Sequence, residues 1–325
     1  MALTNLISGN TVSYTVKNQP GWFYESLLKP KTIAGGYVRV LPNVTKDTRV
    51  KKLVISENTI SQEDDRDCAW TPIERLNLSE KTFQVKNFKI NIEQCLEELD
   101  NIYSENTFNS IGATKDKWPA EQGESLEDAV MFLLQNSLGN DIERLIWGGT
   151  GNAVDGVQNG IIDKLAADPD SIKVQGQAID STNVVGEIEK VYNAIPDVVL
   201  QDADFEPEKA KVQIFVDIKT MRYLKQALAT QPTNYQVILP KFTVEGGKYF
   251  YMGVEIVMIP IFPANTMVAG SKDNLVFVTD LLSDTQELRV RMGADLRDEN
   301  IVFVKGAYRA DAGYIFGNEL VIYQR

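Results

Sequence analysis

The strongest periodic pattern in the chain is a long one-sided apolar stretch from Leu126 to Trp147. Its apolar residues recur at spacings of three and four, which places them on one side of a helix: Leu126, Val130, Leu133, Leu134, Leu138, Ile142, Leu145 and Ile146. Ser125 can cap the first turn, and Gly148-Gly149 can end the last. At 1.5 Å per residue the pattern predicts a rod of about 33 Å, a length that suits a helix lying across a sheet.

The first third of the chain alternates between apolar and polar positions. Residues 37–41 and 50–55 predict strands, and residues 83–92 predict a long returning strand after an acidic tip at 56–68. One alternation is skipped near Asn87, which predicts a β-bulge or a bend. Residues 44–82 therefore predict a long two-stranded excursion. Because an isolated hairpin of that length is marginal in water, we expect it to lie against another surface.

Residues 181–289 predict a second unit that mixes helices and strands. The patterns favour helices at 182–195 and 218–230 and strands at 212–216, 249–252 and 254–259. Between the long helix and this unit, glycines at 148–160 resemble a phosphate-binding loop only superficially. The motif G-x-x-x-x-G-K-[ST] is absent and the glycines follow a helix, so we interpret them as turn residues.

The two ends of the chain give patterns of different clarity. Strands are predicted at 273–280, 300–313 and 319–323. Residues 1–35 show little periodicity around the aromatic cluster Trp22, Phe23 and Tyr24. An extended arm with an apolar patch and a buried first pair of strands both remain open for this segment.

Composition removes several classes of enzyme. The chain has no histidine and two cysteines, which excludes zinc sites of Cys and His and both serine–histidine and cysteine–histidine catalysis. A carboxylate-dependent or lysine-dependent enzyme survives this test. No apolar run approaches the roughly 18 residues of a membrane span. Residues 1–10 lack the features of a signal peptide, so we expect synthesis in a cytoplasm.

The net charge of −12 disfavours a specific DNA-binding module, because an acidic surface repels nucleic acid. The charge is segregated: basic residues dominate 1–60 and acidic residues dominate 61–80. The acidic cluster lacks the central glycine of an EF-hand loop, so we interpret it as a solvated tip. In a repeating assembly, the positive segment of one copy could meet the negative segment of a neighbour.

The order of elements from Gly253 to Arg325, strand, proline-marked turn, strand, polar turn, strand and closing strand, resembles the C-terminal part of tailed-phage major capsid proteins of the Hong Kong 97-type fold. The resemblance implies an α+β fold in four parts. These are an N-terminal arm (1–35), an extended β-hairpin loop (44–82), a peripheral domain with a long spine helix (36–43, 83–180 and 290–325), and an axial αβ domain (181–289).

The resemblance further implies self-assembly into an icosahedral shell that encloses viral double-stranded DNA without sequence-specific binding. The expected partners are other copies of the chain, in pentamers and hexamers, a portal, and possible scaffold or decoration proteins. The expected location is the virion, after synthesis in the host cytoplasm. No enzyme activity, cofactor, metal or membrane is expected. The residues expected at contacts between subunits are Lys46, Arg49, Lys51, Lys52, Glu63, Asp64, Asp65, Asp67, Trp22, Phe23 and Tyr24.

Two other functions remain open at this point. An encapsulin-like nanocompartment shell has the same fold but encloses a protein cargo. A carboxylate-dependent soluble enzyme belongs to another class and would form a small oligomer at most.

Overall fold

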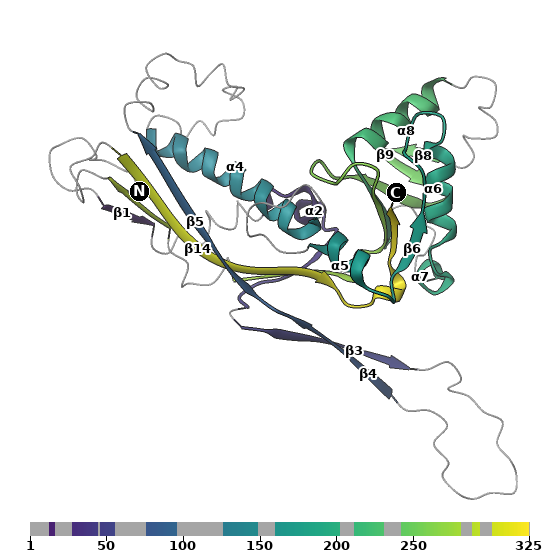
Figure 1. Cartoon of the computed structure of the whole chain (residues 1–325), viewed down its shortest axis with the longest axis horizontal. Helices are drawn as coiled ribbons and strands as arrows, with labels where there is room; N and C mark the ends of the chain where they lie inside the picture. The colour runs from purple at the N-terminus through teal and green to yellow at the C-terminus, as the bar shows by residue number, and fades with distance from the viewer. Residues whose placement is uncertain are drawn as a thin grey trace, which may run out of the picture.

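A computed structural model describes residues 13–16, 28–44, 46–55, 76–95, 126–148, 160–201, 211–230, 242–280, 288–292 and 301–324. Their elements form two sheets with covering helices and a two-stranded hairpin that projects from the body (Figure 1).

The six-stranded sheet is organised around its longest strand, β14 (Ile301–Tyr314). β5 (Lys86–Cys95) pairs with β14 along residues 301–310. The remaining strands follow the order β1-β13-β14-β12-β2, with bounds Ser13–Val16, Leu288–Met292, Ile301–Tyr314, Leu275–Thr279 and Arg39–Leu41.

The long helix α4 (Leu126–Trp147) has the bounds that the sequence predicted, and it lies along β5 and β14 (Figure 1). Gly148 follows α4 with φ +65°. Its backbone lies against Gly160, where a Cβ would come within 2.3 Å of the Gly148 nitrogen. Both positions therefore require glycine. Helix α5 (Ile161–Ala167) begins immediately afterwards.

The seven-stranded sheet carries the second unit. Its strand order is β6-β15-β11-β7-β10-β9-β8, with bounds Ile172–Gln175, Val321–Gln324, Met267–Ser271, Val212–Val216, Val254–Met258, Lys248–Tyr251 and Phe242–Glu245. Helices α6 (Val184–Asn193) and α8 (Ile218–Thr230) pack against each other, and α7 (Asp197–Gln201) follows α6. Their apolar sides share one core with the sheet, since an amphipathic helix is stable when that side is buried.

One apolar core joins the two sheets at the end of α4. Trp147 is fully buried there, with its ring centroid 4.8 Å from that of Phe215 on β7 and 4.9 Å from that of Phe262. The same core contains Phe277 of β12 and Ile322 of β15. Residues from the whole length of the chain therefore hold the body together.

The two-stranded sheet is the predicted hairpin excursion. β3 (Thr48–Ile55) and β4 (Leu76–Phe83) pair antiparallel over eight residues each. The irregularity predicted near Asn87 lies slightly earlier. The chain ends β4 at Phe83, passes Gln84 and Val85, and enters β5 in the other sheet at Lys86. The skipped alternation marks a change of sheet.

Strand pairing crosses the domain boundaries that we expected from the sequence. β6 and β15, from the ranges assigned to the peripheral domain, pair into the seven-stranded sheet. β12, from the range 181–289, pairs into the six-stranded sheet. The predicted domain ranges remain a proposal. The hydrogen-bonded sheets divide the strands differently, as described above.

Candidate assembly site

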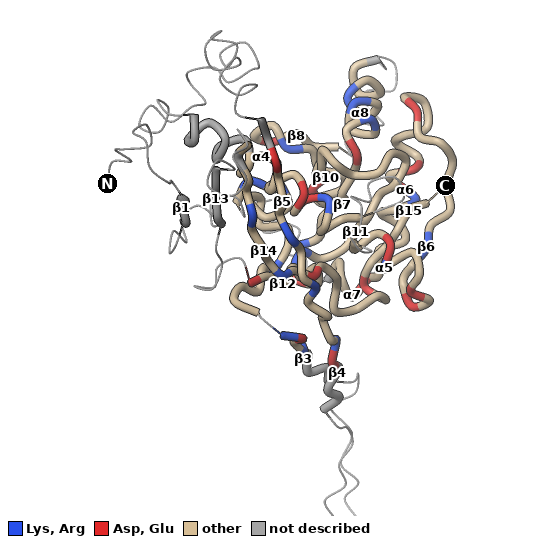
Figure 2. Tube along the Cα trace, turned by 60° about the vertical axis from the view of Figure 1, so that its left-hand side comes forward, with Lys and Arg blue, Asp and Glu red and all other residues tan. Residues whose placement is uncertain are grey.

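The hairpin extends away from both sheets in two views of the molecule (Figures 1 and 2). Its charged side chains pair across the two strands. Lys51 lies opposite Glu80, with 3.1 Å between Nζ and Oε1, and Arg49 Nη1 lies 3.3 Å from Glu80 Oε2. Hydrogen bonding from Lys51 is the main reason why the pKa of Glu80 lies below its ordinary value. Because both cations are exposed, these ion pairs add little to folding stability.

Phe83 fixes the base of the hairpin to the body. Its side chain is 2% exposed and packs with Val276 and Val278 of β12. Gly313 of β14 gives the ring room, since a Cβ at that position would lie 3.0 Å from Phe83 Cε1. The last residue of β4 is therefore a buried attachment point.

Carboxylates satisfy the backbone at the change of sheet. The Gln84 N–H donates to Asp311 Oδ2 at 3.1 Å, and the Val85 N–H donates to Asp47 Oδ1 at 3.3 Å. Asp311 Oδ1 accepts from Lys164 Nζ of α5 at 2.7 Å. Because Asp311 is mostly buried, this pair is less screened than the pairs on the hairpin. It links the direction of the hairpin to the helix that follows α4.

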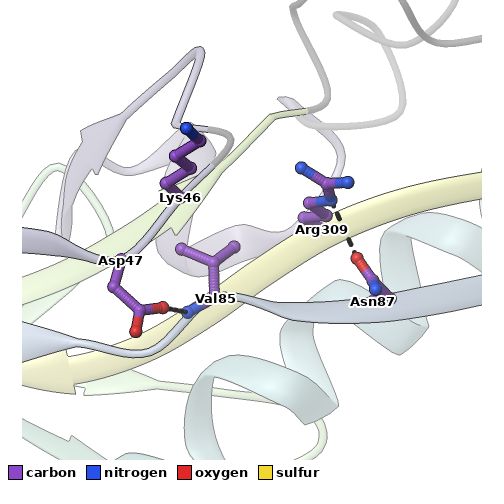
Figure 3. A pocket seen from close by; sticks show the side chains of 5 residues that line it. All are labelled: Lys46, Asp47, Val85, Asn87 and Arg309. Carbon is purple, nitrogen blue, oxygen red and sulfur yellow. Dashed lines mark hydrogen bonds between the residues drawn. The ribbon is translucent and has the colours of Figure 1, made fainter.

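An open depression of about 500 Å³ lies beside this elbow, lined by Lys46, Asp47, Val85, Asn87 and Arg309 (Figure 3). Arg309 Nε donates to Asn87 Oδ1 at 2.8 Å, which holds the guanidinium at the rim. Lys46 is exposed. Two cations, one carboxylate and one amide line the depression, and Asp280 Oδ2 lies 4.0 Å from Arg309 Nε.

A second junction ties the end of the expected N-terminal arm to α4. In α2 (Lys31–Ala34), Thr32 donates its hydroxyl to Glu143 Oε1 at 2.5 Å and its N–H to Glu143 Oε2 at 3.2 Å. Trp147 Nε1 donates to Thr32 Oγ1 at 2.7 Å. Glu143 is 3% exposed, and burial raises its pKa. Residues 31–34 are thus part of the body, although the sequence placed them in the arm.

The structure describes part of the predicted contact set. The side chains of Lys46, Arg49 and Lys51 are exposed on or beside β3, and the backbone of Lys52 lies opposite Ser79. The remaining predicted contact residues lie outside the described residues: Glu63, Asp64, Asp65, Asp67, Trp22, Phe23 and Tyr24.

Sequence reasoning missed the residues that hold the hairpin base. Phe83 was recognised as a strand residue, and the skipped alternation after it was the available signal of an attachment point. The role of Asp311 depends on partners more than two hundred positions away, so no local pattern could identify it.

The described ranges contain no group of three or more His, Cys, Asp or Glu placed to hold a metal ion. No helix in the same ranges is long and apolar enough to cross a membrane.

Comparison with known proteins identifies the fold. No protein-family model matches the sequence, and no curated protein matches it either. Solved structures do match over nearly the whole chain. The satellite phage P4 procapsid structure gives a TM-score of 0.53 at 10% identity, covering 94% of this chain and 98% of the other.

Two further solved structures agree with this match. The Gordonia phage Cozz structure gives a TM-score of 0.54 at 12% sequence identity, and the match covers 91% of this chain and 86% of the other. The capsid of the native GTA particle gives a TM-score of 0.53 at 11% sequence identity, and the match covers 99% of this chain and 95% of the other. The chain therefore has the Hong Kong 97-type fold that the sequence resemblance implied.

Proposed function

We propose that this protein is a major capsid protein that assembles with copies of itself into an icosahedral shell around viral double-stranded DNA. One observation carries the proposal: a charged hairpin projects from a body of the shell-protein fold, and Phe83 at the end of β4 attaches its base to that body. At about 3.3 Å per residue, the eight paired residues of each strand extend roughly 26 Å, far enough to reach over a neighbouring copy.

The exposed face of the hairpin supports this role. Lys46, Arg49 and Lys51 give it positive charge beside Glu80, and the basic rim of the depression at its base continues that charge. Individual contacts of this kind are weak. A subunit that makes several of them at once gains avidity, and closed symmetry then completes the shell.

The net charge of −12 fits a container that confines DNA without reading its sequence. In this proposal the protein acts through binding and has no catalytic step. Its location is the virion after synthesis in the host cytoplasm, and its further partners are a portal and possible scaffold or decoration proteins.

The test is to express the chain and measure its sedimentation before and after concentration. We expect large closed particles visible by electron microscopy, and nuclease-protected DNA in particles purified from a productive infection. A protein cargo in place of DNA would identify a nanocompartment shell and overturn the viral part of the proposal. A small oligomer at every concentration would overturn the shell itself.

Reversing the charge of the hairpin gives a more specific test. We expect Arg49→Glu combined with Lys51→Glu to lower particle yield while the subunit keeps its helical circular dichroism. The matched control is Arg49→Gln with Lys51→Gln, which removes charge without reversing it and should have a smaller effect. Equal yields from all three proteins would contradict a role for these side chains.

A further inference from the structure

Helix α8 carries a stripe of three exposed basic residues. Its thirteen residues include no Asp or Glu. Lys219, Arg222 and Lys225 are exposed at spacings of three, while Met221 and Leu224 of the same helix are buried. Within the described ranges, none of the three cations forms an ion pair with a carboxylate. Like charges at such spacings disfavour an isolated helix, so the stripe reduces stability within one copy.

A buried carboxylate, Asp217, fixes the start of α8. Asp217 is 3% exposed and accepts the N–H groups of Thr220 at 3.2 Å and Lys219 at 3.1 Å. This carboxylate caps the helix and faces inward. Beside the basic stripe, Ile218 leaves 39% of its surface exposed. The outer side of α8 therefore combines fixed positive charge with an apolar residue.

Exposed carboxylates lie around β6 and α7, together with one exposed cation, Lys173 of β6. Asp170, in the turn before β6, and Asp197, at the start of α7, are both exposed. Val198 beside Asp197 is 64% exposed. Figure 2 shows acidic positions around α5, α6 and β6 with a basic position on β6 among them, while α8 carries basic positions at the top of the view.

Other carboxylates of this surface already have roles within the subunit. Asp168 accepts the Tyr314 hydroxyl at 2.6 Å, and Asp180 accepts the N–H and hydroxyl of Thr182 at 2.7 and 2.6 Å. These bonds keep the pKa of each carboxyl below its ordinary value. Asp170 and Asp197 are consequently the positions to change when the surface charge is tested.

The two surfaces lie toward opposite edges of the seven-stranded sheet. β6 and β8 are the two edges of the seven-stranded sheet. Lys225 of α8 lies over Tyr249 of β9, next to the β8 edge, at 5.4 Å from the ring centroid. Helix α6 lies over β11 and β15, next to the β6 edge. Surfaces near opposite edges of one sheet can meet between copies, in a head-to-tail contact of the kind that closes rings.

We propose that the stripe of Lys219, Arg222 and Lys225 on one copy binds the surface around Asp170 and Asp197 on the next copy, with Ile218 packing near Val198. This inference rests on the proposed shell function, and it identifies the faces through which neighbouring αβ units associate. Each exposed charge pair contributes little by itself, so the contact acts through repetition around a ring and weakens as salt screens it.

Charge exchange tests the contact. Variant A carries Lys219→Glu, Arg222→Glu and Lys225→Glu, and variant B carries Asp170→Lys and Asp197→Lys. We expect A and B each to reduce particle yield by about tenfold, as two lost contacts of modest strength would do around a ring. We expect the combined variant to restore yield to within about twofold of wild type. Circular dichroism and thermal unfolding of each subunit show whether it has folded.

Mixing separately purified A and B gives a second measurement, because each supplies the surface that the other has lost. Association of the mixture, with little association of either alone, supports the contact. If A assembles as well as wild type, or if neither the combined variant nor the mixture improves on folded A and B, the contact is refuted while the shell function stands. If wild type itself forms no particles, the proposed function fails first.

Discussion

Replacing Phe83 with alanine tests whether one buried side chain attaches the hairpin to the body. The ring is 2% exposed in a small cluster with Val276 and Val278. Phe→Ala changes in buried sites cost about 3–5 kcal/mol. Because this cluster has few fully buried members and lies near the surface, we expect a loss of about 3 kcal/mol.

Amide hydrogen exchange on unassembled subunits measures this loss of stability directly. The N–H groups of Val44, Gln84 and Val85 are hydrogen-bonded at the hairpin base, to Thr279 O, Asp311 and Asp47 respectively. A loss of about 3 kcal/mol corresponds to a roughly 150-fold fall in their protection from exchange. The amides of β7 lie in the other sheet, so their protection should not change.

Two control variants sharpen the result. Phe83→Leu keeps most of the apolar volume and should lower protection by about tenfold at most. Val244→Ala removes a side chain that is 55% exposed and far along the chain, and should leave all these amides unchanged. A fall of less than threefold in Phe83→Ala, or an equal fall in β7, would refute the idea of a local attachment.

Three other predictions concern individual side chains. Burial raises the pKa of Glu143 above its ordinary value of 4.5. The contribution of this carboxyl group to folding stability is therefore complete below pH 4.5 and is lost as the pH rises through the pKa of the folded state. In Glu143→Gln, the melting temperature should lose this pH dependence. Gly160→Ala should destabilise the folded subunit by about 3 kcal/mol or more, because the new Cβ would clash with the Gly148 backbone. Gly186→Ala, at an open position of a helix, should stabilise it by up to about 1 kcal/mol. Urea unfolding measures both changes. Glu80→Gln should leave the melting temperature of the subunit unchanged, because its partners are exposed.

Local periodicity predicted the regular elements of this fold well. The bounds of α4, β7 and α8 match the predicted ranges because each has strong one-sided or continuous apolar character. The hairpin was also predicted, since alternation over two runs separated by a polar tip is a local signal. These features depend on neighbours within one or two turns, or on the next strand.

Features that depend on distant residues were predicted less well. β15 pairs with β6 and β11, and β12 pairs with β14 and β2, so sheet membership differs from a division by sequence range. The Thr32–Glu143 junction was missed because no local pattern near residue 32 indicates a buried carboxylate more than a hundred positions away. Long-range hydrogen bonds leave no periodic trace.

The contact residues follow the same rule. Exposed charges on β3 were predicted from their position in an excursion, which is a local property. The groups that direct the hairpin, Asp311 and Lys164, come from β14 and α5 and meet only in three dimensions. Sequence therefore identified exposed charges on β3, whose role in contacts stays a prediction, and missed the residues at the base of the hairpin.

Electron cryomicroscopy of the particles formed by the wild-type chain tests the central claim most directly. We expect closed shells in which the hairpin strands β3 and β4 of each subunit lie against the body of another copy. A preparation that stays a small, uniform oligomer over the whole range of concentration and salt, or shells in which the hairpin folds back on its own subunit, would contradict that claim.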